Sequence, residues 1–270
     1  MRILLTNDDG INAPGLKVLE DIARAFSDDI WVVAPAEEQS GAGHSLTITK
    51  PLRLRKHDER RYSVTGTPSD AVIMAVRHLM KDCPPDIILS GVNRGANLAD
   101  DVTYSGTVSA AMEGAISGFS SIAFSQVYAS EGMGDSVPFA CAQGWGEKVL
   151  RPLLALPASQ RRLININFPA MEPDAVKGVK VARQGFHEAD RTKVITGTDP
   201  RGYDYYWYVL GHSKSTQAGT DLEAIAEGYV SVTPLHFDLT HHSAMATIAN
   251  AYDGKENQPE RLNASLDPLP

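Results

Sequence analysis

Cysteine is scarce in this sequence. Only Cys83 and Cys141 occur in 270 residues. Two cysteines are too few for a disulfide framework, and their distant positions do not match the ligand spacing of a zinc site. We therefore expect both to be reduced and to act as small hydrophobic side chains.

Long hydrophobic runs and an excess of positive charge are also lacking. No apolar stretch approaches the roughly 18 residues of a membrane-spanning helix, and the chain opens on a strand-like pattern instead of a secretory signal. Lys and Arg total 25 against 33 Asp and Glu, a net charge of −8. Binding to nucleic-acid polymers needs a basic face. We expect a cytoplasmic protein without a membrane or nucleic-acid partner, in which positive charge for any phosphate must be local.

Apolar segments with strand and helix periodicity alternate along most of the chain. Hydrophobic residues make up 43% and charged residues 21%, so a sizeable core can form. The strand-like segments are 2–6, 29–35, 85–91, 120–127 and 163–168. The helix-like segments are 14–26, 69–80, 105–118 and 138–154. This alternation predicts an α/β fold with a doubly wound, mostly parallel, Rossmann-like sheet between two helical layers.

The pattern changes in the last third of the chain. Residues 178–235 are β-rich and aromatic, which predicts a hairpin extension with strands that return to the core. We expect an α/β catalytic core at 1–177 and a C-terminal segment at 236–270. The polar, proline-ended stretch from Tyr252 onward is expected to be loosely ordered.

Three predicted strands run into oxygen-rich turns, NDDG, EEQSGAGHS and SGVNRGAN. The carboxyl ends of neighbouring parallel strands border one crevice, so these turns should converge. Asp8 and Asp9 stay ionised together only beside a cation, and Gly10 permits the sharp turn that brings both to the tip. Ser40 and Asn93 are the candidates that complete an oxygen shell for Mg²⁺, Mn²⁺ or Ca²⁺. The alternatives are that the Asp pair caps the following helix and that Ser40 and Asn93 are ordinary turn residues.

The segment YSGTVSAAMEGA opens a helix with small residues. The backbone N–H groups of Ser105, Gly106 and Thr107 and the helix dipole would form an anion site there. The alternative is simple helix capping by Ser105 or Thr107. A metal site beside an anion site would make a phosphate pocket. In that pocket Asp8 by preference, or Asp9, would accept a proton from water, and the Asn93 and Asn97 amides would contact phosphoryl oxygens.

Long motifs match a known family. The stretches ILLTNDDGINAPGL, VVAPAEEQSGAGHSLT, VTGTPSDAV, PDIILSGVNRGAN and YSGTVSAAMEGA resemble, in this order, the SurE family of 5′-nucleotidases, the stationary-phase survival proteins. NINFP, DPRGYDYYWY and GYVSVTPL extend the resemblance over nearly the whole chain. It implies a metal-dependent phosphatase acting on nucleoside 5′- and 3′-monophosphates, and in some members on short polyphosphate.

The resemblance also implies residue roles and an assembly. It places the ligands of one divalent cation per subunit, Mg²⁺ or Mn²⁺ with Ca²⁺ in crystals, on Asp8, Asp9, Ser40 and Asn93. It implies a homodimer or homotetramer built through a projecting hairpin near 203–209 and an exchanged C-terminal segment.

Some positions depart from the family pattern or stand outside it. Ala99 occupies a position where the family usually has glycine, which puts the geometry of the phosphate loop in question. His44 lies near the expected crevice as a candidate substrate contact. His241 and His242 resemble a metal motif, but adjacent residues rarely ligate one ion, and a solvated connector is the expectation.

Rival classes lack their required residues. A haloacid-dehalogenase-like phosphatase needs Asp-x-Asp, but Gly10 stands two positions after Asp8. A dinucleotide-binding dehydrogenase needs G-x-G-x-x-G at the first turn, which NDDGINAPG does not contain. A receiver module needs a phosphoacceptor aspartate at a later strand tip, where this chain has ILSGVN.

Overall fold

The computed structural model describes residues 1–127, 139–157, 161–188, 191–211 and 217–252. The chain forms two units, Met1–Leu235 and His236–Pro270. The first unit contains a nine-stranded sheet in the order β3-β4-β2-β1-β5-β6-β7-β11-β8. Its strands are β1 (Ile3–Thr6), β2 (Ile30–Pro35), β3 (Leu54–Asp58), β4 (Arg61–Val64), β5 (Ile87–Arg94), β6 (Ser120–Gln126), β7 (Leu163–Phe168), β8 (Val179–Val181) and β11 (Val230–Leu235).

The sheet is mostly parallel. Strand β1 pairs in parallel with β2 and β5, and β6 pairs in parallel with β5 and β7. Only the β3–β4 and β7–β11 pairs of this sheet are antiparallel among the described strands. The predicted α/β class with a mostly parallel sheet is therefore confirmed, and the carboxyl ends of β1, β2, β5 and β6 share one edge.

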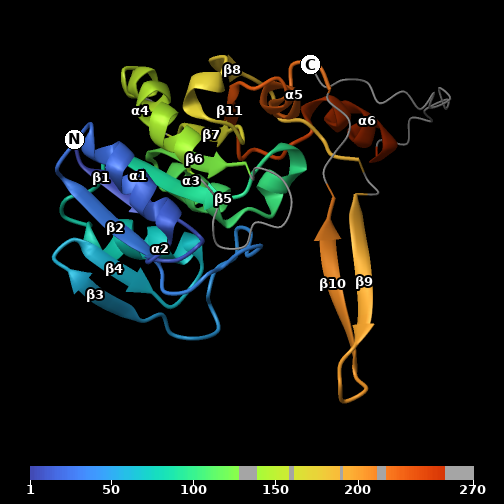
Figure 1. The fold of residues 1–270 in the computed structure, drawn as a ribbon, viewed down its shortest axis with the longest axis horizontal. Coiled ribbons are helices and arrows are strands. Elements are labelled where there is room, and N and C mark those ends of the chain that lie inside the picture. The colour runs from blue at the N-terminus through green and yellow to red at the C-terminus, as the bar shows by residue number, and fades with distance from the viewer. Residues whose placement is uncertain (128–138, 158–160, 189–190, 212–216, 253–270) are drawn as a thin grey trace. The chain divides into compact units, whose positions relative to one another are not determined.

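Helices cover both faces of the sheet (Figure 1). They are α1 (Pro14–Arg24), α2 (Pro68–Met74) with the π-helical continuation η1 (Ala75–Leu79), α3 (Gly106–Ile116), α4 (Ala140–Leu154) and α5 (Asp221–Ala226), with short 3₁₀ turns η2 (Ala99–Thr103) and η3 (Pro173–Ala175). Alternating side chains of β1 serve the two layers. Ile3 and Leu5 belong to the core that includes α1 and α4, whereas Leu4 packs in the core with α2 and α3.

Strand β5 is longer than its predicted segment. It continues to Arg94, with an irregular register against β6 between Ser90 and Asn93. The expectation that Asn93 lies in a turn is wrong: a local bulge lets the strand resume pairing, and Asn93 pairs with Ser125. Strands β3 and β4 were not predicted, because the edge strand LRKHD is polar and mostly exposed.

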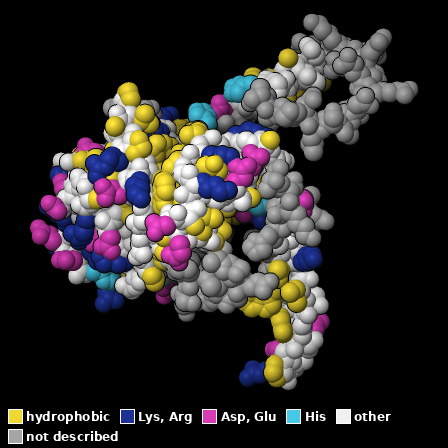
Figure 2. Space-filling model, turned by 45° about the horizontal axis from the view of Figure 1, so that its top comes forward, with side chains coloured by type: hydrophobic (Ala, Val, Ile, Leu, Met, Phe, Trp, Pro, Cys, Tyr) yellow, Lys and Arg dark blue, Asp and Glu magenta, His cyan; other side chains and the backbone are white. Residues whose placement is uncertain are grey.

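A separate antiparallel hairpin is formed by β9 (Thr192–Thr198) and β10 (Asp204–Leu210). It confirms the predicted C-terminal hairpin. Tyr206, Trp207 and Tyr208 are exposed, and Figure 2 shows hydrophobic side chains gathered on this hairpin. Aromatic residues are enriched at protein interfaces.

The second unit contains α6 (His242–Tyr252). His241 precedes this helix and His242 is its first residue, so the expectation of a connector is wrong for His242. His242 Nε2 lies 3.3 Å from Asp238 Oδ2, one helical turn earlier. The tail beyond Tyr252, which the sequence predicts to be loosely ordered, lies outside the described residues. No helix in the described part of the chain is long and apolar enough to cross a membrane.

Candidate active site

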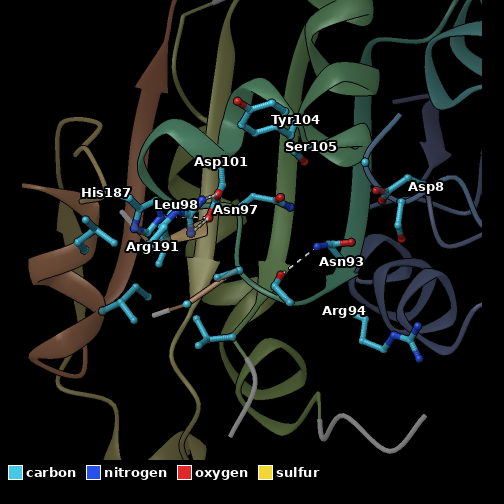
Figure 3. Close-up of a pocket in the computed structure, with 18 of the residues that line it drawn as sticks. Asp8, Asn93, Arg94, Asn97, Leu98, Asp101, Tyr104, Ser105, His187 and Arg191 are labelled. Atoms are coloured by element: carbon cyan, nitrogen blue, oxygen red, sulfur yellow. Dashed lines mark hydrogen bonds and ion pairs between the residues drawn. The ribbon is translucent and has the colours of Figure 1, made fainter. Parts of the chain in front are cut away.

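A cavity of about 570 Å³ lies where the central parallel strands end. Asp8, Ser40, Asn93, Asn97 and Ser105, all predicted from the sequence, line it (Figure 3). They come from the turns after β1 and β2, from β5 and its following loop, and from the start of α3. The structure thus brings together side chains that lie far apart in the sequence, from Asp8 to Ser105.

Asp8 lies directly against the first turn of α3. The Thr107 hydroxyl donates to Asp8 Oδ1, and a Cβ added at Gly106 would lie 2.7 Å from Asp8 Cβ. Asp8 is only 4% exposed. Burial is the main cause that raises the pKa of Asp8 to about 7, the charge of Asp9 contributes to the increase, and the Thr107 hydrogen bonds oppose it.

Asp9 is half-buried beside Asp8. Its Oδ2 accepts the backbone N–H of Arg94 at 3.2 Å. Burial raises the pKa of Asp9, whereas the Arg94 N–H and charge lower it. The alternative that this pair caps α1 is wrong, because the N-cap residue of α1 is Ala13, without a side-chain cap.

Asn93 and Ser40 present oxygen atoms near the acidic pair. Asn93 Nδ2 donates to the Gly95 carbonyl at 3.0 Å, and Figure 3 shows the amide oxygen of Asn93 pointing toward Asp8. The exposed Ser40 donates its hydroxyl to Glu38 Oε1 at 2.8 Å. The hydroxyl oxygen retains lone pairs while it donates this hydrogen bond, so the bond to Glu38 does not by itself prevent Ser40 from binding a cation.

These donors fit a hard divalent cation. They supply two carboxylates, an amide oxygen and a hydroxyl, and oxygen-only sets favour Mg²⁺, Mn²⁺ or Ca²⁺ over zinc. The raised pKa of Asp8 marks a site where negative charge is poorly compensated by the protein. Across the described ranges, no cluster of three or more His, Cys, Asp or Glu side chains forms an alternative metal centre.

The start of α3 is only partly available to an anion. Ser105 is the N-cap, and its hydroxyl accepts the Val108 N–H at 3.0 Å, so the capping interpretation is correct for this side chain. The backbone N–H of Ser105 donates to the Asp101 carbonyl at 3.1 Å. The N–H groups of Gly106 and Thr107 lie in the first helical turn, where the helix itself provides no acceptor, but the Thr107 N–H already interacts with Asp8.

Asn97 is held by a buried polar network that sequence reasoning missed. Its backbone N–H donates to Asn167 Oδ1 at 2.8 Å, and its carbonyl accepts Asn165 Nδ2 at 2.7 Å. Its own Nδ2 donates to Ser125 Oγ at 2.8 Å. The signal was present in LININF, where two asparagines two positions apart share one face of a fully buried strand.

Ala99 adopts the left-handed conformation, with φ of 52°. Its N–H donates to Asp221 Oδ2 at 2.8 Å, while Oδ1 accepts the N–H groups of Gly185 and Leu222, both at 2.9 Å. Burial raises the pKa of Asp221, and these three hydrogen bonds lower it. Asp221 therefore fixes the backbone at the position where the family usually has glycine.

Positive charge also reaches the cavity from the C-terminal half. His187 Nε2 lies 3.0 Å from Asp101 Oδ2, and Arg191 forms an ion pair with the same carboxylate. All three residues line the cavity, and no local sequence signal indicated them. His44 instead contacts Glu113 on α3, at 3.0 Å.

The fold and this site together indicate the class of protein. This is an α/β protein with a cavity at the carboxyl ends of its parallel strands, where paired carboxylates meet a helix N-terminus. The model of the family described as Survival protein SurE matches residues 3–191. The chain belongs to the SurE family, which confirms the resemblance.

Similar proteins match nearly the whole chain. A protein named 5′-nucleotidase SurE from Rhizorhabdus wittichii is 62% identical over 253 residues, which cover 93% of this chain and 100% of that protein. One of the same name from Erythrobacter litoralis is 59% identical over 254 residues, 94% of this chain and 100% of that protein. The crystal structure of the SurE protein from Aquifex aeolicus has a TM-score of 0.80 and 40% identity, covering 94% of this chain and 100% of that one.

Proposed function

We propose that this protein is a divalent-cation-dependent phosphatase that hydrolyses nucleoside 5′-monophosphates to nucleoside and phosphate. Relatives that are 62% and 59% identical over nearly the whole chain carry the name 5′-nucleotidase. The observation that carries the proposal is the contact between the buried Asp8 and the first turn of α3. This contact supports the proposal, because a phosphate ester bound with a cation would need a carboxylate for the cation next to a helix end for the anion.

The proposed roles follow from the chemistry of each group. Asp8, Asp9, Ser40 and Asn93 would hold the cation, which supplies charge neutralisation for phosphate and a lower pKa for a bound water. Asp8 is the preferred group to accept a proton from that water, with Asp9 as the alternative.

Donors beside the metal site would neutralise the phosphoryl oxygens. The N–H group of Gly106 and the amide of Asn97 would stabilise negative charge that develops there. The N–H groups of Ser105 and Thr107 are left out of this set, because the first donates to the Asp101 carbonyl and the second already interacts with Asp8. Ser105 contributes by capping the helix that presents the Gly106 N–H.

The proposal extends to substrates, cation and assembly. Nucleoside 3′-monophosphates and short polyphosphate are included as further substrates, and Mg²⁺ or Mn²⁺ as the cation. We propose a homodimer or homotetramer in which the aromatic β9–β10 hairpin and the segment 236–270 contact the neighbouring subunit. The exposed aromatic side chains of the hairpin support this assembly.

A phosphate-release assay tests the proposed activity. The purified protein is freed of metal with a chelator and then supplied with Mg²⁺, Mn²⁺ or Ca²⁺ in the presence of adenosine 5′-monophosphate. We expect hydrolysis to disappear on chelation and to return with Mn²⁺ or Mg²⁺, without a trapped phosphoenzyme. Undiminished hydrolysis after complete chelation, or no hydrolysis of any nucleotide with any cation, would contradict the proposal.

A further inference from the structure

The cavity extends well beyond the phosphate end. Its volume of about 570 Å³ falls in the range of roughly 300–1,000 Å³ that accommodates whole organic ligands. Figure 3 shows Asp8 and Asn93 on one side and Leu98, His187 and Arg191 on the opposite side, with Asn97 between them. A phosphoryl group bound at the first side therefore leaves most of the space for the rest of its ester.

Helix α5 gives this remaining space an apolar wall. Leu222 and Ile225 line the cavity, are three positions apart and so lie on the same side of the helix. Both are only half-buried, whereas Asp221 and Ala224 of the same helix are buried. Leu98, on the loop after β5, lines the same cavity. Partly exposed leucine and isoleucine beside a polar site are typical of a surface that binds the apolar part of a ligand.

The wall is rigidly connected to the phosphate end. Asp221, at the start of α5, binds the N–H of Ala99 through Oδ2 at 2.8 Å. Ala99 directly follows Leu98 and lies two residues after Asn97, which is itself held by β7. The apolar wall and the proposed phosphate contact therefore keep a fixed spacing, which is what recognition of one molecule through two of its parts requires.

We propose that Leu222 and Ile225 of α5, with Leu98, form the nucleobase-binding wall of the active site. This inference rests on the proposed function, since it assigns the part of the cavity that receives the base of the nucleoside monophosphate. A planar base offers a large apolar face, and burying that face against aliphatic side chains stabilises the complex.

The chemistry of the wall also sets its selectivity. The neighbouring polar side chains Asp101, His187 and Arg191 bind one another, and among the described residues the remaining nitrogen of His187, Nδ1, is buried without a partner and closed to solvent. The aliphatic wall itself therefore offers the base contact area instead of hydrogen bonds. Apolar contacts discriminate weakly between ligands. Purine and pyrimidine nucleotides should both be hydrolysed, with kcat/KM higher for purines by about tenfold or less.

Two substrates that differ only in the base test the wall. Adenosine 5′-monophosphate and ribose 5-phosphate share the phosphate and the sugar, so the ratio of their kcat/KM values isolates the contribution of the base. Ile225→Ala and Leu222→Ala should each lower this ratio by about fivefold through a higher KM for the nucleotide, and leave ribose 5-phosphate unchanged. The milder Ile225→Val should retain most of the ratio.

Val181→Ala is the matched control. Val181 is an aliphatic residue on β8, 77% exposed, and does not line the cavity. Its substitution should change neither substrate. Circular dichroism and thermal melting confirm that each variant is folded, and if Ile225→Ala does not fold, Ile225→Val and Leu222→Met take its place with a smaller expected decrease.

Two outcomes separate this inference from the proposed function. An unchanged ratio, or an equal decrease for both substrates in folded variants, would overturn the wall while the phosphatase assignment stands. If the wild-type protein hydrolyses neither substrate, the proposed function fails, and the wall is then judged by calorimetric binding of adenosine. Weaker adenosine binding by Ile225→Ala than by Val181→Ala would support the wall, and equal binding would refute it.

Discussion

The two ends of the cavity are built in different ways. The phosphate end combines Asp8, Asn93 and the start of α3, each of which directly follows or belongs to a central parallel strand or opens a helix. The apolar end depends on α5, which lies more than a hundred residues later in the chain. Reactive groups are thus positioned by the sheet edge itself, whereas the organic part of the ligand meets an element brought there by tertiary folding.

The buried aspartates at the two ends of the cavity, Asp8 and Asp221, also differ in their surroundings. Asp221 receives three backbone N–H groups, two on Oδ1 and one on Oδ2. Asp8 lies beside a second carboxylate, and burial raises its pKa to about 7. Asp221 therefore holds backbone segments together, whereas the second carboxylate beside Asp8 would make a bound cation favourable there.

The largest expected effect is at the phosphate end. Asp8→Asn or Asp9→Asn should reduce kcat/KM for adenosine 5′-monophosphate by at least about a thousandfold, because each removes a charge that we propose holds the cation. Steady-state phosphate release measures the loss, and circular dichroism verifies the fold. Full activity in both variants would rule out the proposed role of the pair.

Gly106→Ala tests the contact between Asp8 and α3. The new Cβ would lie 2.7 Å from Asp8 Cβ, so the helix start has to move away from the carboxylate. We expect kcat to fall by about a hundredfold, the size of effect seen when a precisely placed oxyanion donor is lost. Ile116→Ala at the exposed end of the same helix is the control and should retain activity. Near-normal turnover by Gly106→Ala would show that the helix start does not bind the reacting group.

The stability of the metal-free protein should depend on pH through Asp8. The folded-state pKa of about 7 exceeds the ordinary value of 3.8, so the folded protein holds this proton more tightly than the unfolded chain. The stabilisation is complete below about pH 4 and is lost as the pH rises to about 7, a change of about 2 kcal/mol or more.

Denaturant unfolding of chelated wild type and Asp8→Asn from pH 4 to pH 8 measures this term as the difference between the two proteins. Asp8→Asn should lose less stability over that range, because its amide does not titrate. Parallel curves for the two proteins would mean that Asp8 ionises in the folded state as easily as in water.

Asp221→Asn should have a smaller effect, at the opposite end of the comparison. An amide nitrogen cannot accept an N–H, so the variant leaves at least one of the three backbone donors unpaired and should lower the free energy of unfolding by about 1–3 kcal/mol.

Ala99→Gly should change turnover less than about threefold, because Ala99 already adopts the required left-handed conformation with its N–H bound. Urea unfolding checks Asp221→Asn, and kcat measurements check Ala99→Gly. A large gain in turnover from Ala99→Gly would show that Ala99 restrains the loop.

The sequence predicted the parts of the site that depend on local pattern. The NDDG turn, the glycine-flanked Ser40 and the small residues of YSGTVSAA were each placed at a strand end or helix start by local pattern, and the roles assigned to them stay predictions. The prediction that Asn93 lies in a turn was wrong. Asn93 belongs to β5, because a bulge lets this strand continue, and such a bulge has no clear sequence signature. The hydrogen bonds of Asn97 to β7 and of Ala99 to Asp221 join residues 68 to 122 positions apart, and only the folded chain defines them.

Crystallography of the manganese-soaked protein tests the central claim most directly. We expect one anomalous scattering peak per chain, coordinated by carboxylate oxygens of both Asp8 and Asp9 and by the amide oxygen of Asn93. A data set with solvent alone at this edge of the sheet, or with the manganese bound elsewhere and the two carboxylates turned toward basic side chains, would contradict the account.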